Sequence, residues 1–290
     1  MEEKGILDQR SLPDKDFEEL WNRIIIPQEI KDQLRAQILL EFTVRTQLTS
    51  RAAVPLHGII LLVGAPGTGK TSLAKGVASA AASAINDGKI KFIEVEPHTL
   101  TSSALGRSQR EVREFLENVV TEHANQGPLI VLLDEVETLV SDRSKMSLEA
   151  NPIDVHRATD AMLAGLDNLA AKFPQLVFIA TSNFEGAIDP AFISRADVVF
   201  RIEKPNLEAC SLILKDTIEV MAEKWPDIAR LIDSPSFKTV AAEAEGLDGR
   251  QIRKCVLSAC TLNTEVALNP GLLNIKQLRK SLRQAKSIQK

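Results

Sequence analysis

The sequence predicts an α/β domain with a five-stranded parallel sheet flanked by helices, followed by a small all-helical domain. Five short apolar runs follow one another in the first 202 residues, and the segments between most of them have helical spacing. This alternation of strand and helix is typical of a parallel sheet covered by helices on both faces. The predicted strands are Ile59–Val63, Ile90–Val95, Leu129–Leu133, Val177–Thr181 and Val198–Ile202.

Three regions follow from the same pattern. Residues 1–20 are polar and are expected to form a flexible arm, and residues 21–205 hold the α/β domain, which opens with a helix at 27–48. No strand-like run follows residue 205, so residues 206–290 are expected to form a helical lid domain. Proline and glycine separate its predicted helices, at 207–225, 237–245, 249–268 and 273–288.

Composition excludes several classes of function. The chain of 290 residues carries a net charge of −4 and only 4% aromatic residues, which disfavours a broad nucleic-acid surface or base-stacking platform. Its three cysteines, Cys210, Cys255 and Cys260, lack metal-binding spacing and are expected to be buried thiols in a reducing compartment. With no apolar signal segment and no run long enough to span a membrane, the protein is expected to be cytoplasmic.

A phosphate-binding loop lies between the first predicted strand and the helical run at 72–84. The segment GAPGTGKT, residues 64–71, matches the pattern G-x-x-x-x-G-K-[ST] in its required strand–loop–helix context, which argues against an accidental glycine-rich turn. Lys70 is expected to reach the β- and γ-phosphates of ATP, and the Thr71 hydroxyl to bind Mg²⁺. The residues predicted to bind nucleotide here are Gly64, Ala65, Pro66, Gly67, Thr68, Gly69, Lys70, Thr71 and Ser72.

Two acidic residues follow the third predicted strand. Asp134 and Glu135 come directly after Leu129–Leu133. Two carboxylates at the end of a buried parallel strand are costly unless they have a function there or are solvated. Next to a phosphate-binding loop, the functional interpretation is favoured over an ordinary solvated strand end. Asp134 is expected to hold Mg²⁺, partly through water, and Glu135 to polarise the attacking water.

Four further polar residues are candidates for the same site. Asn183 ends the fourth strand and could orient the water, although asparagine is also common in turns. Arg195, just before the fifth strand, could reach the γ-phosphate of a neighbouring subunit. Arg250, and less surely Arg253, opens a lid helix and could fold back onto the phosphates. Each arginine taken alone is as readily a surface residue.

These motifs together resemble an AAA+ ATPase. The details are most similar to the pachytene-checkpoint branch, whose members remodel HORMA-domain proteins, and the resemblance covers about residues 20–285. The short region before the phosphate-binding loop resembles the compact bacterial form found beside cyclic-nucleotide anti-phage systems. The segments that carry the resemblance are GAPGTGKT, LLDEVETLVSDR, Ser144–Ala164, TSNFEGAIDPAFISRADVVF and GLDGRQIRK.

The resemblance implies a role for each candidate. Asp134 and Glu135 would form the Walker B pair, Asn183 would be sensor 1 and Arg250 sensor 2. Arg195 would be the arginine finger that acts on the next subunit, which implies a homohexameric ring. The implied partner is a HORMA-domain protein bound to a cyclic-nucleotide synthase, which the ATPase would switch off.

The resemblance also places a substrate-gripping loop at residues 103–107. The family usually has an aromatic residue there, whereas this chain has Leu105 followed by Gly106. Leu105 would be the main gripping residue, and its smaller surface predicts a weaker grip per stroke. A second, polar pore loop is expected within residues 141–154.

A DNA-associated or scaffold ATPase of the clamp-loader type is the alternative function. Three arginines could mark a nucleic-acid track, but a glutamate follows each of them at i+4, which favours paired charges on a solvated helix. With the acidic net charge, this pattern favours a polypeptide substrate. The residues concerned are Arg107, Arg110, Arg113, Glu111, Glu114 and Glu117.

Overall fold

The computed structural model describes residues 4–48, 56–85, 89–100, 107–142 and 152–288, and the chain divides into two compact units. The α/β unit comprises Met1–Asn22, Gln28–Gly64 and Lys70–Ile202. The helical unit comprises Glu203–Lys290 together with two short pieces from earlier in the chain, Arg23–Pro27 and Ala65–Gly69. Most of the phosphate-binding loop therefore packs with the helical unit, although both its flanks belong to the α/β unit.

The α/β unit contains a six-stranded sheet in the order β1-β3-β4-β5-β2-β6. All five predicted strands are present and pair in parallel, which confirms the α/β fold class. Their interiors are continuous runs of buried apolar residues, as expected of a sheet covered on both faces. The five are β2 (Ile59–Val63), β3 (Ile90–Val95), β4 (Leu129–Leu133), β5 (Leu176–Ser182) and β6 (Val198–Arg201).

The sixth strand comes from the segment expected to be a flexible arm. β1 (Ile6–Leu12) pairs antiparallel with β3 at the edge of the sheet, and α1 (Lys15–Arg23) follows it. Exposed and partly buried residues alternate along β1 and only Leu12 is fully buried, so the strand presents one face to the protein and one to solvent. Its place depends on backbone hydrogen bonds to β3 more than on apolar burial.

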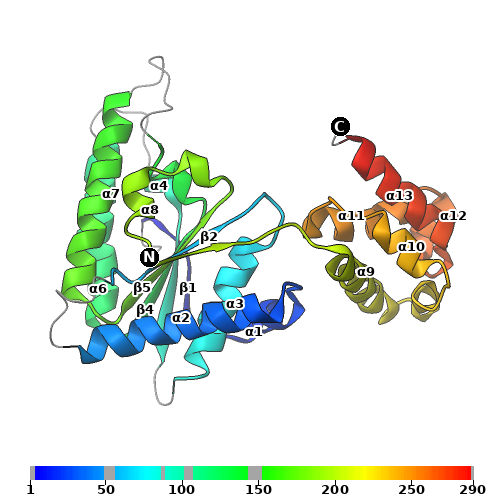
Figure 1. The fold of residues 1–290 in the computed structure, drawn as a ribbon, viewed down its shortest axis with the longest axis horizontal. Coiled ribbons are helices and arrows are strands. Elements are labelled where there is room, and N and C mark those ends of the chain that lie inside the picture. Colours follow the sequence, from blue (N-terminus) through cyan, green and yellow to red (C-terminus); the bar gives the residue numbers. More distant parts are fainter. Residues whose placement is uncertain (1–3, 49–55, 86–88, 101–106, 143–151, 289–290) are drawn as a thin grey trace. The chain divides into compact units, whose positions relative to one another are not determined.

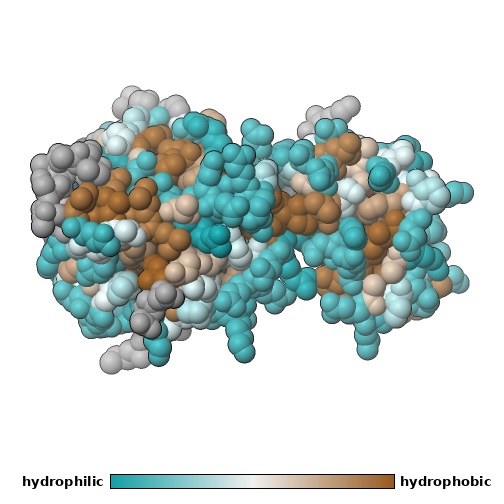
Figure 2. Space-filling view, turned by 60° about the horizontal axis from the view of Figure 1, so that its bottom comes forward, coloured by the Kyte–Doolittle hydropathy of each residue, from teal (hydrophilic) through white to brown (hydrophobic). Residues whose placement is uncertain are grey.

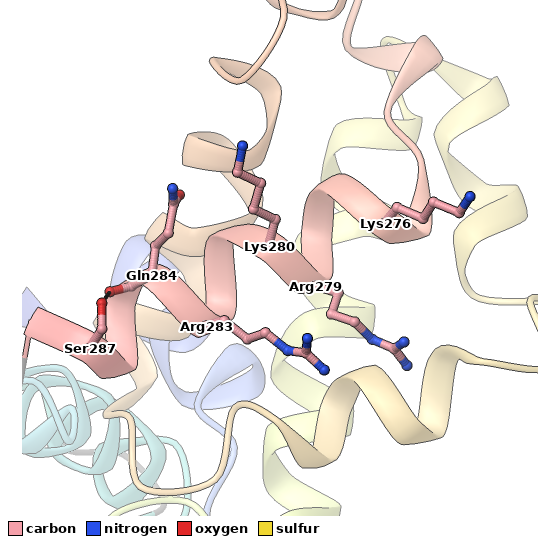
Figure 3. A pocket seen from close by; sticks show the side chains of 6 residues that line it. All are labelled: Lys276, Arg279, Lys280, Arg283, Gln284 and Ser287. Atoms are coloured by element: carbon pink, nitrogen blue, oxygen red, sulfur yellow. Dashed lines mark hydrogen bonds between the residues drawn. The ribbon is translucent and has the colours of Figure 1, made fainter.

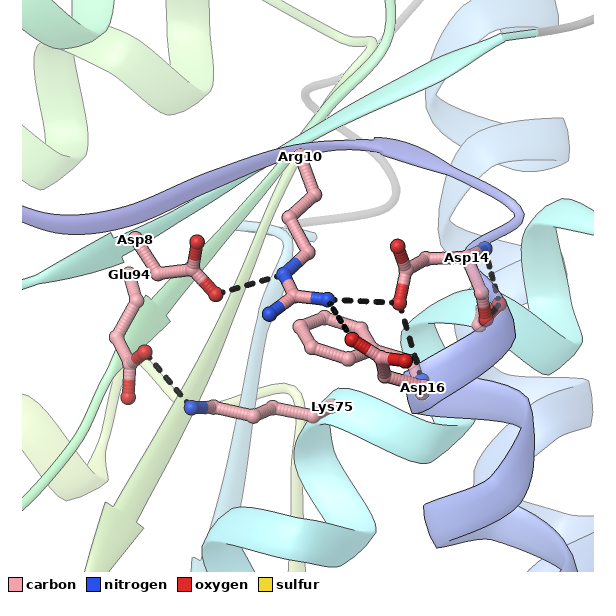
Figure 4. Close-up of polar contacts among 8 residues, drawn as sticks. Asp8, Arg10, Asp14, Asp16, Lys75 and Glu94 are labelled. Carbon is pink, nitrogen blue, oxygen red and sulfur yellow. Dashed lines mark hydrogen bonds and ion pairs between the residues drawn. The ribbon is translucent and has the colours of Figure 1, made fainter.

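Arg10 joins β1 to the start of α1 (Figure 4). Its guanidinium donates to the carboxylates of Asp8, Asp14 and Asp16 at 2.8, 3.0 and 2.8 Å, and its Cζ lies 4.7 Å from the ring centre of Phe17. The hydrogen bonds that Arg10 donates to Asp16 and, next in size, to Asp8 raise the pKa of Arg10. Four charged groups and one buried ring thus fix the N-terminal segment against the sheet edge.

Helices cover both faces of the sheet (Figure 1), with α7 on one side and α3 on the other. The face toward α7 is a single apolar cluster of strand residues with α5, α6, α7 and the π-helical turn Phe115–Val120. On the opposite face, the buried Lys75–Glu94 ion pair, 2.8 Å long, joins α3 to β3. The helices are α2 (Gln28–Gln47), α3 (Lys70–Ala82), α4 (Pro97–Leu100), α5 (Arg107–Glu114), α6 (Thr121–Asn125), α7 (Pro152–Lys172) and α8 (Pro190–Ile193).

The helical unit has its own apolar core, which also receives Ile25. Side-chain caps set its helix starts, because Asn206 accepts the Ala209 N–H and Asp248 forms a capping box with Gln251. The helix predicted at 249–268 is two helices, since Asn263 caps a new one. The helices are α9 (Leu207–Ala222), α10 (Phe237–Ala242), α11 (Gly249–Cys260), α12 (Thr264–Leu268) and α13 (Ile275–Ile288).

The three cysteines are buried, as expected from the sequence, and the surface is mixed in character. Cys210, Cys255 and Cys260 are free and buried, and burial raises the pKa of each thiol. On the face drawn in Figure 2, hydrophobic residues form separate patches among hydrophilic ones. None of the described helices is both long and apolar enough to cross a membrane.

Candidate active site

The register of the parallel strands brings the predicted site residues of the α/β unit to one edge of the sheet. Val63 of β2 pairs with Ser182 of β5, and Leu133 of β4 pairs with Ala180 of β5. The residues that follow these strands, Gly64, Asp134 and Asn183, therefore emerge side by side at the carboxyl edge. The Gly64 N–H donates to the Ser182 carbonyl at 3.2 Å, which closes this end of the sheet.

Lys70 lies within this group and is only 6% exposed. Its ammonium donates to the Gly64 carbonyl at 2.8 Å and to the Asn183 side-chain oxygen at 2.9 Å. Both acceptors are neutral oxygens at the base of the phosphate-binding loop. A phosphate oxygen is a stronger acceptor for the same ammonium, so the arrangement fits a nucleotide phosphate.

Asp134 accepts two hydroxyl hydrogen bonds from different elements. Thr71 at the start of α3 donates to its Oδ1 at 2.8 Å, and Thr181 at the end of β5 donates to the same oxygen. A hydroxyl and a carboxylate in direct contact are the donor set that Mg²⁺ takes beside a nucleotide, so these residues fit that ion. Thr181 was given no role from sequence, although it precedes Asn183 by two residues in the TSN segment.

Glu135 has an unusual backbone. Its φ of 49° and ψ of 53° place it in the left-handed region, and it is the single non-glycine residue with positive φ among the described residues. The conformation costs about 1–2 kcal/mol and is offset by two contacts. The Glu135 N–H donates to the Thr181 hydroxyl, and the Asn183 amide donates to Glu135 Oε1, both at 3.1 Å. The strain holds an exposed carboxylate beside the predicted phosphate position.

Glu137 is a second residue that sequence reasoning missed. Its Oε1 accepts the Asn183 backbone N–H at 3.1 Å, while its Oε2 is buried and accepts no hydrogen bond from the residues that the structure describes. Glu137 thus fixes the backbone of Asn183, whose side chain contacts both Lys70 and Glu135. Its position, two residues after Glu135, is the signal that could have identified it.

The central part of the phosphate-binding loop packs within the helical unit. Gly67 and Gly69 have φ values of 79° and 93°, which residues with a Cβ rarely adopt. A Cβ on Gly67 would lie 2.2 Å from Asp248 Oδ1, and the Arg250 N–H donates to the Gly67 carbonyl at 3.3 Å. The N-terminus of α11 therefore contacts the loop directly.

The two lid arginines have different environments. The Arg250 side chain is exposed, and no polar partner is found for it in the described part of the chain. The Arg253 guanidinium is paired with Asp216 and donates to the Thr217 hydroxyl at 3.2 Å. Of the two, Arg250 is the one available to a ligand.

Arg195 is not joined to the Lys70–Asp134–Asn183 group. It lies between α8 and β6, and both oxygens of Asp167 on α7 accept from it, at 2.7 and 2.8 Å. Donation of these hydrogen bonds to Asp167 is the main cause that raises the pKa of Arg195. Ser72, also predicted to bind nucleotide, lies partly buried in the first turn of α3.

The pore residues cannot be placed in the same way. Leu105 and Gly106 lie outside the described residues, as does most of the second loop expected at 141–154.

On α5, the Arg110–Glu114 ion pair of 2.7 Å confirms one of the predicted i+4 pairs. In the described part of the chain, no three His, Cys, Asp or Glu side chains form a metal-binding group.

A cationic hollow of about 330 Å³ lies on α13 (Figure 3). Two of its arginines, Arg279 and Arg283, are paired with Glu243 at 3.1 and 2.6 Å, so part of its charge is neutralised. None of the residues predicted to act on the nucleotide lines it. Its six lining residues are Lys276, Arg279, Lys280, Arg283, Gln284 and Ser287.

Comparison with known families agrees with this geometry. Residues 60–204 match the model of the ATPase family associated with various cellular activities (AAA), and this span holds the phosphate-binding loop, the acidic pair and Arg195. The chain belongs to the AAA ATPase family. It is therefore a nucleotide-binding ATPase, and the cluster around Lys70 and Asp134 lies where the motifs of such an enzyme are expected.

Individual relatives show which AAA ATPases the chain is similar to. The chain is 50% identical over 285 residues to CD-NTase-associated protein 6 of Pseudomonas aeruginosa, covering 98% of this chain and 93% of that protein. It is 29% identical to a putative pachytene checkpoint protein 2 of Caenorhabditis elegans, covering 83% of this chain but 62% of the relative. This AAA ATPase thus spans about three fifths of the length of that eukaryotic relative.

Solved structures have the same fold. The structure of C. elegans PCH-2 matches with a TM-score of 0.78 at 25% identity, covering 99% of this chain and 78% of that one. A chain of the E. coli MS115-1 HORMA:CdnC:Trip13 complex matches with a TM-score of 0.75 at 18% identity, covering 97% and 95%. The second likeness supports the fold alone.

Proposed function

We propose that this AAA ATPase is a ring-forming protein remodeller that takes apart complexes of a HORMA-domain protein. The observation that carries the proposal is the connected group Lys70, Asp134, Glu135 and Asn183, which links a phosphate-binding cation to a strained carboxylate through one amide. The substrate class is supported by the relatives, whose names refer to a CD-NTase, a pachytene checkpoint and a HORMA complex.

Within one subunit, the residues divide the chemistry of ATP hydrolysis. Lys70 and the loop N–H groups would bind the phosphates, while Thr71 and Asp134 would hold Mg²⁺, partly through water. Bound Mg²⁺ would neutralise charge on the phosphates. Glu135 would accept a proton from the attacking water, and Asn183 would orient that water. Arg250 of the helical unit would add a positive charge near the phosphates.

The neighbouring subunit would complete the site. Arg195 lies apart from the Lys70 group, and a guanidinium supplied by the next subunit is a common way to stabilise the charge that develops on the γ-phosphate. A closed ring, which we propose to be a homohexamer, would give every nucleotide such a neighbour. Ring assembly would then be part of catalysis.

The output of hydrolysis would be force on a peptide. Leu105 and Gly106 would contact a segment of the HORMA protein in the central pore, and pulling would release the HORMA protein from a cyclic-nucleotide synthase. The synthase, once released, would be switched off, which would make the ATPase a negative regulator of anti-phage signalling. The clamp-loader alternative lacks a supporting observation, since Arg110 on α5 is paired with Glu114.

The Glu135→Gln variant tests this proposal. It should retain ATP and Mg²⁺ binding but hydrolyse ATP at least about a hundredfold more slowly, because glutamine cannot accept the proton. Held in the ATP state, the variant should retain the HORMA-domain protein in a pull-down from cells that express the candidate HORMA and synthase genes.

The matched control carries Lys70→Ala in addition to Glu135→Gln. Without the ammonium the double variant should not bind ATP, and capture should disappear if it depends on the nucleotide state. Normal hydrolysis by Glu135→Gln would contradict the role of Glu135. ATP-dependent capture of DNA in place of a protein would support the clamp-loader alternative.

A further inference from the structure

The pairing of Arg195 with Asp167 has a defined geometry. Asp167 Oδ1 accepts from Nε at 2.7 Å and Oδ2 accepts from Nη2 at 2.8 Å, so the carboxylate covers one edge of the planar guanidinium. On the other side, Nη1 donates to the Ala191 carbonyl at 2.8 Å. The side chain is 25% exposed, so the guanidinium still reaches the surface.

Among the described residues, acceptors are found for three of the five N–H groups of the Arg195 guanidinium. A guanidinium has five N–H groups: one on Nε and two on each terminal nitrogen. Asp167 takes the Nε–H and one N–H of Nη2, and Ala191 takes one N–H of Nη1. In the described part of the chain, no acceptor is found for the remaining N–H on each terminal nitrogen. The open N–H of Nη2 belongs to the end edge of the guanidinium, because Asp167 takes the side-edge N–H of the same nitrogen, and it suits an oxygen of a phosphate.

The elements that hold the pair are anchored by packing and hydrogen bonds. Asp167 lies on the 21-residue helix α7, and Leu166 and Leu169 on either side of it are buried in the apolar core. Two residues after Arg195, the Asp197 carboxylate accepts the N–H groups of His57 and Ile59 at 2.9 and 2.8 Å, which fixes the segment to β2. Both partners therefore have defined positions in the free subunit.

We propose that Asp167 is a positioning residue that directs the end edge of the Arg195 guanidinium toward the phosphates of ATP in the neighbouring subunit. The inference rests on the proposed function, in which Arg195 acts across a subunit boundary. Side-edge pairing supports positioning over sequestration, because a carboxylate that sequestered the arginine would cover the end edge. Fixing the guanidinium in advance avoids the entropic cost of ordering a long side chain during reaction.

Mixed rings test this inference separately from the proposed function. Arg195→Ala subunits bind ATP but lack the finger, and Lys70→Ala subunits lack ATP but keep it. If Arg195 acts in trans, mixing the two should restore ATP hydrolysis where an Arg195→Ala site borders a Lys70→Ala neighbour. Absence of restoration would count against the proposed function, whatever the role of Asp167.

The role of Asp167 is then tested by introducing Asp167→Ala into one kind of subunit at a time. Placed in the Lys70→Ala subunit, which supplies Arg195, it should lower the restored kcat by about tenfold or more, with KM for ATP unchanged. Placed in the Arg195→Ala subunit, it should have no effect. Asp167→Asn in the supplying subunit should give an intermediate kcat, because the amide keeps one acceptor oxygen.

The control is Asn168→Ala, which alters the next, exposed residue of α7 and should leave restoration unchanged in either subunit. Full restoration with Asp167→Ala in the supplying subunit would overturn the inference, and so would equal losses in both placements, which would indicate a general structural role. A rise in kcat would also overturn it, since it would show that Asp167 restrains Arg195.

Discussion

The cationic side chains at the carboxyl edge of the sheet and at the surface around Arg195 have different environments. At the edge, Lys70 is buried and directed at the Asn183 oxygen and the Gly64 carbonyl. At the surface, Arg195 is partly exposed and bound on one edge by Asp167, with two N–H groups left open in the described part of the chain. The first region is organised within one subunit. We propose that the second serves a partner outside it.

This contrast indicates what each region can do alone. We expect the group around Lys70 to bind a nucleotide in an isolated subunit, because its geometry is set by strands β2, β4 and β5. A surface arginine with an open edge gains its function only when an anion is brought to it. Substitutions in the two regions should therefore affect different measured quantities.

The largest expected effects separate ATP affinity from turnover. Lys70→Ala should weaken ATP binding by about a hundredfold or more, because a charge-assisted contact inside the subunit is lost. Arg195→Ala should lower kcat by about a thousandfold while the Kd for ATP stays within about threefold. Titration with a fluorescent ATP analogue and steady-state hydrolysis measure the two quantities. Loss of ATP binding in Arg195→Ala would remove the contrast.

A smaller effect is expected from Thr181→Val. Thr181 donates to Asp134 and accepts from the Glu135 N–H. Valine keeps the shape of the strand residue, removes one of the two hydroxyl donors to Asp134 and takes the acceptor from the Glu135 N–H. We expect kcat to fall by about tenfold. Thr159→Val on α7 is the control, because its buried hydroxyl has no hydrogen-bond partner among the described residues. Equal loss in both variants would indicate damaged packing instead.

The smallest effect on activity concerns Glu41, a buried residue of α2 whose carboxyl interacts with the charge of Asp197. Burial, and then the charge of Asp197, raise the pKa of its carboxyl from 4.5 to about 7, although Gln37 donates to it at 2.7 Å. The folded protein thus holds this proton more tightly than the unfolded chain does. Its contribution to stability is complete below pH 4.5, and about 3 kcal/mol is lost as the pH rises through 7.

Urea unfolding of Glu41→Gln between pH 5 and 8 measures this contribution. The variant should lose that part of the pH dependence, while hydrolysis at pH 7 should change by less than about twofold. Glu29→Gln, which alters an exposed acid on the same helix, should keep the dependence of the unchanged protein. An unaltered pH dependence in Glu41→Gln would show that its carboxyl titrates normally.

Prediction from sequence succeeded where a local pattern carries the information. The five parallel strands are continuous apolar runs. The phosphate-binding loop at residues 64–71 can be identified from its own eight residues and the segments on either side. β1 was missed because a half-exposed edge strand needs few apolar residues, and ILDQRSL contains three. Its pairing with β3 depends on backbone groups that are the same in every sequence.

The supporting residues were missed for a different reason. Thr181 and Glu137 act through residues that sequence did identify, and their contacts depend on the register of β4 and β5 and on the turn at Glu135. The partnership of Arg195 with Asp167 joins residues 28 positions apart on different elements. No spacing rule in a single sequence connects such pairs, because only the folded sheet brings them together.

The membership of Ala65–Gly69 in the helical unit gives the phosphate-binding loop a second structural support. The loop is covalently continuous with β2 and α3 on either side, yet its Gly67 lies against Asp248, and the Gly67 carbonyl accepts the Arg250 N–H. A phosphate held by the loop backbone would therefore also stabilise the packing of the loop on the N-terminus of α11.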